Sequence, residues 1–178
     1  MVLKSFLPEV PGLQMLKIEA DPNQVTLTLR STTARIKCPS CCRSARRIHS
    51  RYWRRVVDAP CLGRSVVNHI EVRRFRCDNR ACQRQTFAER LGPAIEPYAR
   101  RTSRQRLQHE AVSVALSAQA AARLSVDLRM AASASTMLRL VRRIPLPVAE
   151  PPTCIGVDDW AMRRGHRYGT LIVDLQRR

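Results

Sequence analysis

Cys38-Pro39-Ser40-Cys41 and Cys77-Asp78-Asn79-Arg80-Ala81-Cys82 are the two stretches that decide the fold of the first half of this chain. The first has the spacing C-x2-C and the second C-x4-C, and each can present two thiolates from one turn. Two such turns make a tetrahedral four-sulfur site for Zn²⁺. We therefore predict a structural zinc ion bound by Cys38, Cys41, Cys77 and Cys82.

Other residues leave this ligand set open. Cys42 stands where the turn of a zinc ribbon often needs a positive φ, so it either changes the turn or competes as a ligand. His49 and His69 could complete a mixed site, although surface positions are the simpler expectation. Cys61 and Cys154 are expected to be buried as small apolar residues. Reduced cysteines without a metal are the alternative to zinc.

Segments rich in β-forming residues surround the cysteine pairs. Val25, Leu27 and Leu29 alternate with threonines after a turn at residues 21–23, which predicts a β-hairpin within residues 1–35. Between the two pairs, residues 52–57 and 66–75 are rich in β-branched and aromatic side chains. We therefore predict a zinc-ribbon domain over residues 36–92, with the cysteine pairs at the ends of a small sheet.

The stretch from Tyr98 to Ile144 contains neither Gly nor Pro, which is typical of helices. We predict three helices, at residues 103–116, 118–124 and 136–143, the last two capped by Ser117 and Ser135. Met137, Leu138 and Val141 are expected to pack inward from the last helix. Residues 98–144 then fit a helix-turn-helix DNA-binding region. A plain helical bundle is the alternative.

The charge of the chain indicates a polyanionic partner. Lys and Arg number 32 against 14 acidic residues, giving a net charge of +18 and a pI of about 11.2. Aromatic residues make up only 4%, which argues against a stacking platform for single strands. We therefore expect duplex DNA, held through phosphate contacts from Arg100, Arg101, Arg104 and Arg106. The third helix is expected to enter the major groove with Ser135, Thr136, Arg139, Arg142 and Arg143.

The last segments differ in character from the rest. Four prolines within residues 145–152 predict an extended linker over residues 145–153. In residues 154–178, an apolar run leads to Asp158 and Asp159, and a second β-rich run returns with Asp174, which predicts a β-hairpin. Acidic residues on neighbouring strands are typical of Mg²⁺ sites for phosphoryl transfer. Adjacent residues on a strand face opposite sides, so only one of Asp158 and Asp159 can point into such a site.

The order of these segments resembles the ISL-three family of insertion-sequence transposases. The resemblance covers nearly the whole chain and rests on residues 38–41, 49–52, 72–77, 86–91 and, most specifically, 155–175. It implies that Asp158, rather than Asp159, is the first carboxylate of a DDE triad that binds Mg²⁺ on a complete RNase H-like domain. The second Asp and the Glu are expected beyond Arg178. We therefore expect this chain to be truncated and to lack complete strand-transfer chemistry by itself.

Together these features predict an α+β chain made of an N-terminal β-hairpin, a zinc ribbon, a helix-turn-helix region and the first hairpin of an incomplete RNase H-like domain. We expect a transposase fragment that binds the terminal inverted repeats of an insertion sequence, with homo-oligomerisation on DNA left open. A non-catalytic, zinc-containing DNA-binding regulator is the alternative, and an RNA-binding zinc ribbon is a second one. Since no secretory signal or long apolar run is present, we expect a cytoplasmic, nucleoid-associated bacterial protein without a membrane partner.

Overall fold

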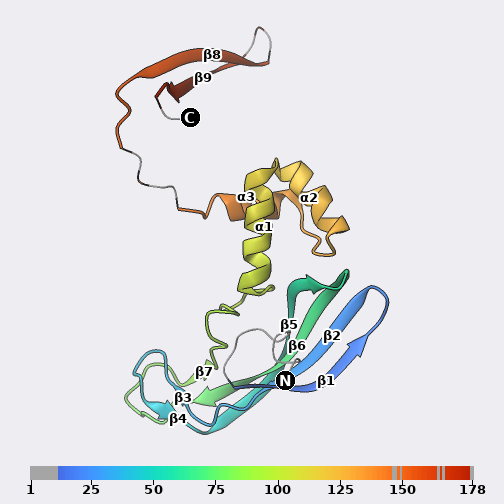
Figure 1. The fold of residues 1–178 in the computed structure, drawn as a ribbon. Helices are drawn as coiled ribbons and strands as arrows, with labels where there is room; N and C mark the ends of the chain where they lie inside the picture. Colours follow the sequence, from blue (N-terminus) through green and yellow to red (C-terminus); the bar gives the residue numbers. More distant parts are fainter. Residues whose placement is uncertain (1–11, 146–147, 149, 164, 166, 177–178) are drawn as a thin grey trace. The chain divides into compact units, whose positions relative to one another are not determined.

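The computed structural model describes residues 12–145, 148, 150–163, 165 and 167–176 (Figure 1). The chain divides into two units, Met1–Ile144 and Pro145–Arg178, which are described separately. Among the described residues, three helices and several β-sheets form a mixed α+β fold. None of the described helices is both long and apolar enough to cross a membrane.

Two β-hairpins build the main sheet of the first unit (Figure 1). β1 (Leu13–Ala20) and β2 (Gln24–Ser31) are antiparallel, and so are β5 (Ile48–Cys61) and β6 (Arg64–Arg76). The turn Leu62-Gly63 has positive φ at both positions, 50° and 71°, as a type I′ hairpin turn requires. The strand order is β1-β2-β6-β5, with β2 and β6 parallel. The predicted N-terminal hairpin (residues 1–35) and the predicted zinc-ribbon domain (residues 36–92) therefore contribute strands to the same sheet.

The core of this sheet follows the two-residue period of its strands. Leu27 and Leu29 from β2 are buried together with Ile70 and Val72 from β6. Leu91, Ile95 and Val56 belong to the same buried cluster. The alternation that predicted a half-buried strand at residues 25–29 thus places its leucines in the core.

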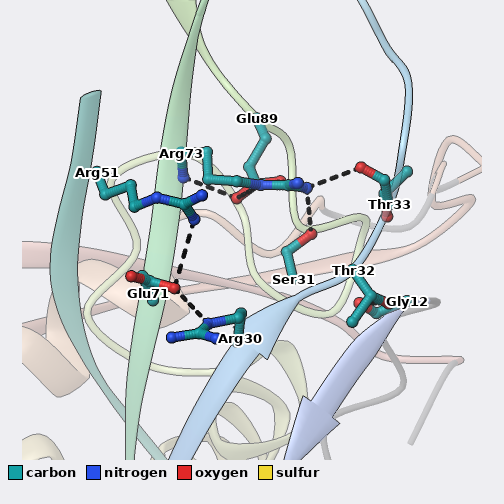
Figure 2. Close-up of polar contacts among 9 residues, drawn as sticks. All are labelled: Gly12, Arg30, Ser31, Thr32, Thr33, Arg51, Glu71, Arg73 and Glu89. Carbon is teal, nitrogen blue, oxygen red and sulfur yellow. Dashed lines mark hydrogen bonds and ion pairs between the residues drawn. The ribbon is translucent and has the colours of Figure 1, made fainter. Parts of the chain in front are cut away.

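A buried ion pair connects β6 to the chain that follows it. The side chain of Arg73 donates to the Glu89 carboxylate at 2.7 Å and 3.2 Å, and also to the Ser31 hydroxyl and the Thr33 carbonyl (Figure 2). Glu89 also accepts the backbone N–H of Arg73 at 2.7 Å. Because both side chains are almost fully enclosed, each needs these partners to offset its lost hydration.

The acidic residue of β6 itself, Glu71, bridges the two neighbouring strands. Glu71 accepts from Arg30 of β2 at 2.6 Å and lies 3.6 Å from the Arg51 guanidinium of β5 (Figure 2). β6 pairs with β5 inside its own hairpin and with β2 of the other hairpin, so the two hairpins are connected by the Arg30–Glu71 ion pair as well as by backbone hydrogen bonds.

The helices begin and end close to the predicted positions, except that the second ends at Asp127 rather than at residue 124 and the third begins at Ala134 rather than at residue 136. α1 spans Ser103–Ala115, α2 spans Ala118–Asp127 and α3 spans Ala134–Val141. Ser117 caps α2 as predicted. The predicted Ser135 cap of the third helix is wrong, because Ser133 has the extended backbone of a cap and accepts the Thr136 N–H at 3.3 Å. Starting the helix at Ala134 places Ser135 inside its first turn.

The earlier start of α3 also changes which residues face inward. Met137 and Leu140 are buried, whereas Leu138, predicted to pack inward, is 42% exposed. The helical core also takes in a polar stripe from α1, made of Gln105, His109 and Ser113. Because these three side chains are polar, no apolar pattern marked the inward face of α1 in the sequence.

The second unit contains one antiparallel hairpin, β8 (Ile155–Arg163) paired with β9 (Arg167–Asp174). The Pro-rich segment precedes it, and the boundary between the units falls after Ile144. Most of the described side chains of this hairpin, including Val157, Trp160 and Ile172, are exposed. The hairpin predicted over residues 154–178 is therefore present.

Candidate metal centre and nucleic-acid interface

The four predicted cysteine ligands lie in two turns that face each other. Cys38 and Cys41 lie between the short strands β3 (Ile36–Lys37) and β4 (Ser44–Ala45). Cys77 and Cys82 lie between β6 and β7 (Thr86–Ala88), and β7 pairs with the end of β6. Pairing of β6 with β7 closes the second turn, while the β3–β4 pair closes the first.

The sulfur atoms form a compact set. Cys38 Sγ lies 4.0 Å from Cys82 Sγ, and Cys41 Sγ lies 3.5 Å from Cys77 Sγ. All four sulfurs lie within 4.8 Å of one another. Tetrahedral zinc with Zn–S bonds of ~2.3 Å needs sulfurs about 3.8 Å apart. The cysteine cluster therefore fits a four-coordinate ion such as zinc in both donor type and spacing.

Backbone hydrogen bonds shape the first turn. The Cys42 N–H donates to the Cys38 carbonyl, and the Cys38 N–H donates to the Arg43 carbonyl, each at 2.9 Å. Cys42 adopts a positive φ of 58° although it carries a side chain. Its side chain is exposed and it is absent from the sulfur set. The turn therefore takes the backbone form that a ribbon needs, even though glycine is missing.

The second turn is longer and is built in the same manner. The Cys77 N–H donates to the Gln85 carbonyl at 2.8 Å, and the Cys82 N–H donates to the Asn79 carbonyl at 3.1 Å. The Asn79 side chain also accepts the Ala81 N–H at 3.1 Å. This asparagine turn accommodates the two additional residues of the C-x4-C spacing.

The thiols differ in their tendency to ionise. A hydrogen bond from the Arg43 backbone lowers the pKa of Cys41 to about 6. The Asn79 backbone acts to lower the pKa of Cys77, but burial and the neighbouring sulfur of Cys41 outweigh it and raise that pKa to about 12. Thiolates this close repel one another, so full ionisation of the set requires a cation among them.

An apolar layer supports the cysteine cluster. Phe75 and Phe87 are buried with ring centroids 6.2 Å apart, and Cys38 and Ala45 are buried beside them. The Arg73 guanidinium lies 5.1 Å from the Phe75 ring centre.

The remaining cysteines and the two candidate histidines lie elsewhere. His49 and His69 are exposed and do not belong to the sulfur set. Cys61, expected to be buried, is partly buried and packs against the main core. Cys154 was expected to be buried but is exposed, because the described residues of its hairpin offer little cover.

Two groups of predicted DNA-contacting residues meet in one cleft of the first unit, which we call the helical cleft. The segment before α1 contributes residues 96–101, α3 contributes Thr136 and Arg139, and Arg143 follows the end of α3. The cleft has a volume of about 540 Å³ and is lined by Arg100, Arg101, Arg106, Arg139 and Arg143. Burial, and secondarily the charge of Arg139, lower the pKa of Arg101. A bound anion would offset the repulsion between the Arg101 and Arg139 guanidinium groups.

The other predicted contacts lie outside the lining of the helical cleft. Arg104 donates to the buried Asp58 carboxylate at 2.6 Å and 2.7 Å, and so takes part in holding α1 against β5. Ser135 on α3 and Arg142, the C-cap of that helix, are exposed. The Ser135 hydroxyl lies 3.0 Å from that of Ser133.

A second cleft, which the sequence did not reveal, lies over the sheet. This sheet cleft has a volume of about 570 Å³. Its basic and aromatic lining residues are Tyr52, Arg54, Arg74, Arg84, Phe87, Arg90 and Tyr98. The Arg74 guanidinium lies 5.3 Å from the Tyr52 ring centre. In the sequence, only the placement of Tyr52 and Arg54 two residues apart on one strand could have indicated this cleft. Arg74 comes close to Tyr52 through the pairing of β5 with β6, which the sequence alone does not show.

The candidate carboxylates lie on the β8–β9 hairpin. Asp158 and Asp159 are exposed, and Asp159 accepts from the Thr170 hydroxyl at 2.9 Å. Asp174 is half-buried and accepts the Gln176 N–H at 3.0 Å. Within the described ranges, the cysteine cluster is the one group of potential ligands arranged to hold a metal ion.

Comparison with known proteins yields one curated relative. The chain is 26% identical over 164 residues to the transposase for insertion sequence element IS1001 of Bordetella parapertussis. The aligned region covers 92% of this chain but only 39% of that relative. No protein-family model matches the chain, and no solved structure matches it. The similarity supports a transposase without bearing on the ISL-three family, and it extends over nearly all of this chain.

Proposed function

We propose that this chain is the DNA-recognising part of a transposase and binds duplex DNA through the helical cleft. The observation that carries the proposal is the convergence of five arginines from two separate segments on one concave surface. Guanidinium groups bind phosphate oxygens in a fork geometry, and clustered cations at this density favour a polyanion. The similarity to a transposase makes the ends of an insertion sequence the natural DNA target.

Within this proposal, α2 and α3 act as a helix-turn-helix. α3 has exposed polar residues along one side, and Arg139 donates to the Thr136 hydroxyl at 3.2 Å, so both lie on the same face. The turn is clamped by Ser125, whose hydroxyl accepts the Ala132 N–H at 3.0 Å and donates to the Ala122 carbonyl at 2.7 Å. A rigid turn fixes the angle at which a recognition helix could enter the major groove.

A zinc ion held by the cysteine cluster would have a structural role in the same proposal. It would fix the end of β6 and the β3–β4 turn, both of which border the sheet cleft. We further propose that the β8–β9 hairpin begins an RNase H-like domain of the ISL-three type, in which Asp158 would be a Mg²⁺ ligand once the remaining carboxylates are supplied.

The test is duplex binding measured by fluorescence anisotropy at salt concentrations from about 50 to 200 mM. If the cleft arginines make about five phosphate contacts, affinity should fall roughly 100-fold or more over this range. Arg139→Ala should weaken binding and reduce the salt slope by about one if this residue contacts phosphate.

Lys17→Ala is the matched control for charge, because Lys17 lies on β1 and is paired with Glu19. It removes the same charge from outside both clefts and should leave the salt slope unchanged. Binding that is insensitive to salt, or equal effects of Arg139→Ala and Lys17→Ala, would refute the helical cleft as the DNA site.

A further inference from the structure

One aromatic side chain between the two clefts takes no part in packing. Tyr98 is 97% exposed and lines both the helical cleft and the sheet cleft. Its φ is 62°, a left-handed backbone conformation that is uncommon for a non-glycine residue. An exposed ring on an unfavourable backbone does not stabilise the fold, so its presence calls for another reason.

The local sequence explains the backbone but not the choice of tyrosine. The Ala99 N–H donates to the Glu96 carbonyl at 3.1 Å, and Pro97 occupies the second position of this four-residue turn. Proline in the second place and a positive φ in the third are the features of a type II turn, which favours glycine where Tyr98 stands. Tyrosine is therefore the unexpected residue at this position.

The turn is also held firmly. The Arg54 guanidinium donates to the Ala99 carbonyl at 2.7 Å. The Val57 N–H donates to the Arg100 carbonyl, and the Thr102 N–H donates to the Val57 carbonyl, each at 2.9 Å. These bonds anchor the C-terminal side of the turn to β5, and the Arg54 guanidinium also lies 3.4 Å from the Glu96 carbonyl on the other side. Tyr98 is therefore presented from a fixed support.

The surroundings of the ring are strongly basic on both sides. Arg100, Arg101 and Arg139 lie in the helical cleft, and Arg74 and Arg84 lie in the sheet cleft. Nucleic acid held by both clefts would carry its phosphates past these groups and bring a base to the ring between them.

Building on the DNA binding proposed above, we infer that Tyr98 stacks on a single unpaired base of DNA that occupies both clefts. Paired bases inside a duplex are already stacked on their neighbours, so an exposed ring gains most where a base is unpaired or unstacked. A single ring serves one base and not a continuous strand. The ligand is thus a duplex flanked by an unpaired base, and the ring should accept any base because each has a π-face.

The test compares two DNAs, a blunt duplex and the same duplex with a short single-stranded extension whose first unpaired base is 2-aminopurine. The wild-type chain should bind the extended DNA more tightly and quench the 2-aminopurine fluorescence. Tyr98→Gly should lose roughly 5- to 100-fold affinity for the extended DNA and abolish the quenching, while its affinity for the blunt duplex should fall by a much smaller factor, because that duplex offers no unpaired base to the ring. Since glycine suits this turn, this variant is expected to keep its melting temperature.

Two further variants isolate the ring. Tyr98→Phe should behave as wild type, because stacking needs the ring and not the hydroxyl. Trp53→Ala removes another exposed aromatic side chain, which neighbours the cleft residues Tyr52 and Arg54 on β5 and so points to the opposite side of the sheet. It should change neither DNA affinity nor quenching.

The outcomes separate this inference from the function on which it rests. If the wild-type chain binds neither DNA in a salt-dependent manner, the proposed function fails. If it binds both DNAs but Tyr98→Gly retains full affinity and quenching, the stacking role alone is refuted. A loss in Tyr98→Phe equal to that in Tyr98→Gly would also overturn it, since the hydroxyl would then carry the contact.

Discussion

At the scale of single residues, the first unit depends on buried charge. Asp58 on β5 is fully buried and accepts hydrogen bonds from the Arg104 guanidinium, the Thr102 hydroxyl and the Asn68 amide. Thr102 is itself the N-cap of α1. One carboxylate therefore joins the sheet, the cap and the first turn of the helical region.

Asp58→Asn should destabilise the first unit by about 2–3 kcal/mol. The substitution removes the negative charge that faces Arg104, and breaking a buried pair costs about 3–5 kcal/mol before allowing for the partial exposure of Arg104. Urea unfolding at neutral pH measures the loss. Glu19→Gln is the control, because its pair with Lys17 is exposed and should contribute less than about 1 kcal/mol. Equal effects of the two substitutions would contradict this role for Asp58.

A second buried residue, His109, should make stability depend on pH. Its Nε2 donates to the Met130 carbonyl at 2.6 Å, while its Nδ1 makes no hydrogen bond with the described part of the chain. Burial lowers the pKa of His109 below the usual 6.5, with a further contribution from the charge of Arg101. In the unfolded chain the His109 imidazole therefore binds a proton near pH 6.5, whereas in the folded chain it stays neutral at that pH.

This difference in proton binding makes the free energy of unfolding depend on pH. The stabilisation is fully present above pH 6.5 and is lost as pH falls below it, by up to about 1.4 kcal/mol per pH unit. Urea unfolding between pH 7.5 and 5.5 should show this decline in wild type and a shallower one in His109→Gln. His69→Gln, at an exposed site on β6, should keep the wild-type slope. An identical pH profile for all three proteins would rule the effect out.

At the scale of elements, local patterns were readable from the sequence and tertiary partners were not. The cysteine cluster was predictable because ligand spacing within a turn is a local property. The start of α3 was wrong by two residues because Ser133 and Ser135 are equally good caps in sequence. Arg104 was assigned to phosphate because its partner Asp58 lies 46 residues away. Nothing in the sequence marked Tyr98 as a candidate binding residue, because its positive φ is known only from the folded turn.

The two cysteine turns form the element that zinc should control. Elemental analysis of the purified chain should give one zinc per chain, with Cys38, Cys41, Cys77 and Cys82 protected from thiol reagents. Cys77→Ser should lose the metal and lower the melting temperature, because structural zinc contributes directly to folding.

Cys154→Ser is the matched control for this measurement. It removes an exposed thiol from the β8–β9 hairpin, outside the sulfur set, and should change neither zinc content nor melting temperature. A folded wild-type chain without zinc, in which all seven thiols react freely, would contradict the metal site.

At the scale of the whole molecule, charge is distributed unequally between interior and surface. Of 14 acidic residues, Asp58, Glu71 and Glu89 are engaged with arginines inside the first unit. These carboxylates are largely enclosed, so they contribute little to the field that a ligand meets. The electrostatic potential at the surface is therefore dominated by the exposed arginines. This agrees with a DNA affinity that comes largely from phosphate contacts.

The parallel pairing of β2 with β6 has a consequence for how this chain assembles as it leaves the ribosome. Each hairpin can close from neighbouring sequence, but Arg30 and its partner Glu71 are 41 residues apart. The inner edge of β2 must therefore wait, unpaired, until β6 has been synthesised. Joining the two hairpins is the non-local step, and such steps are slow because a long loop is ordered first. During that interval β2 is the segment most open to wrong pairing with another chain.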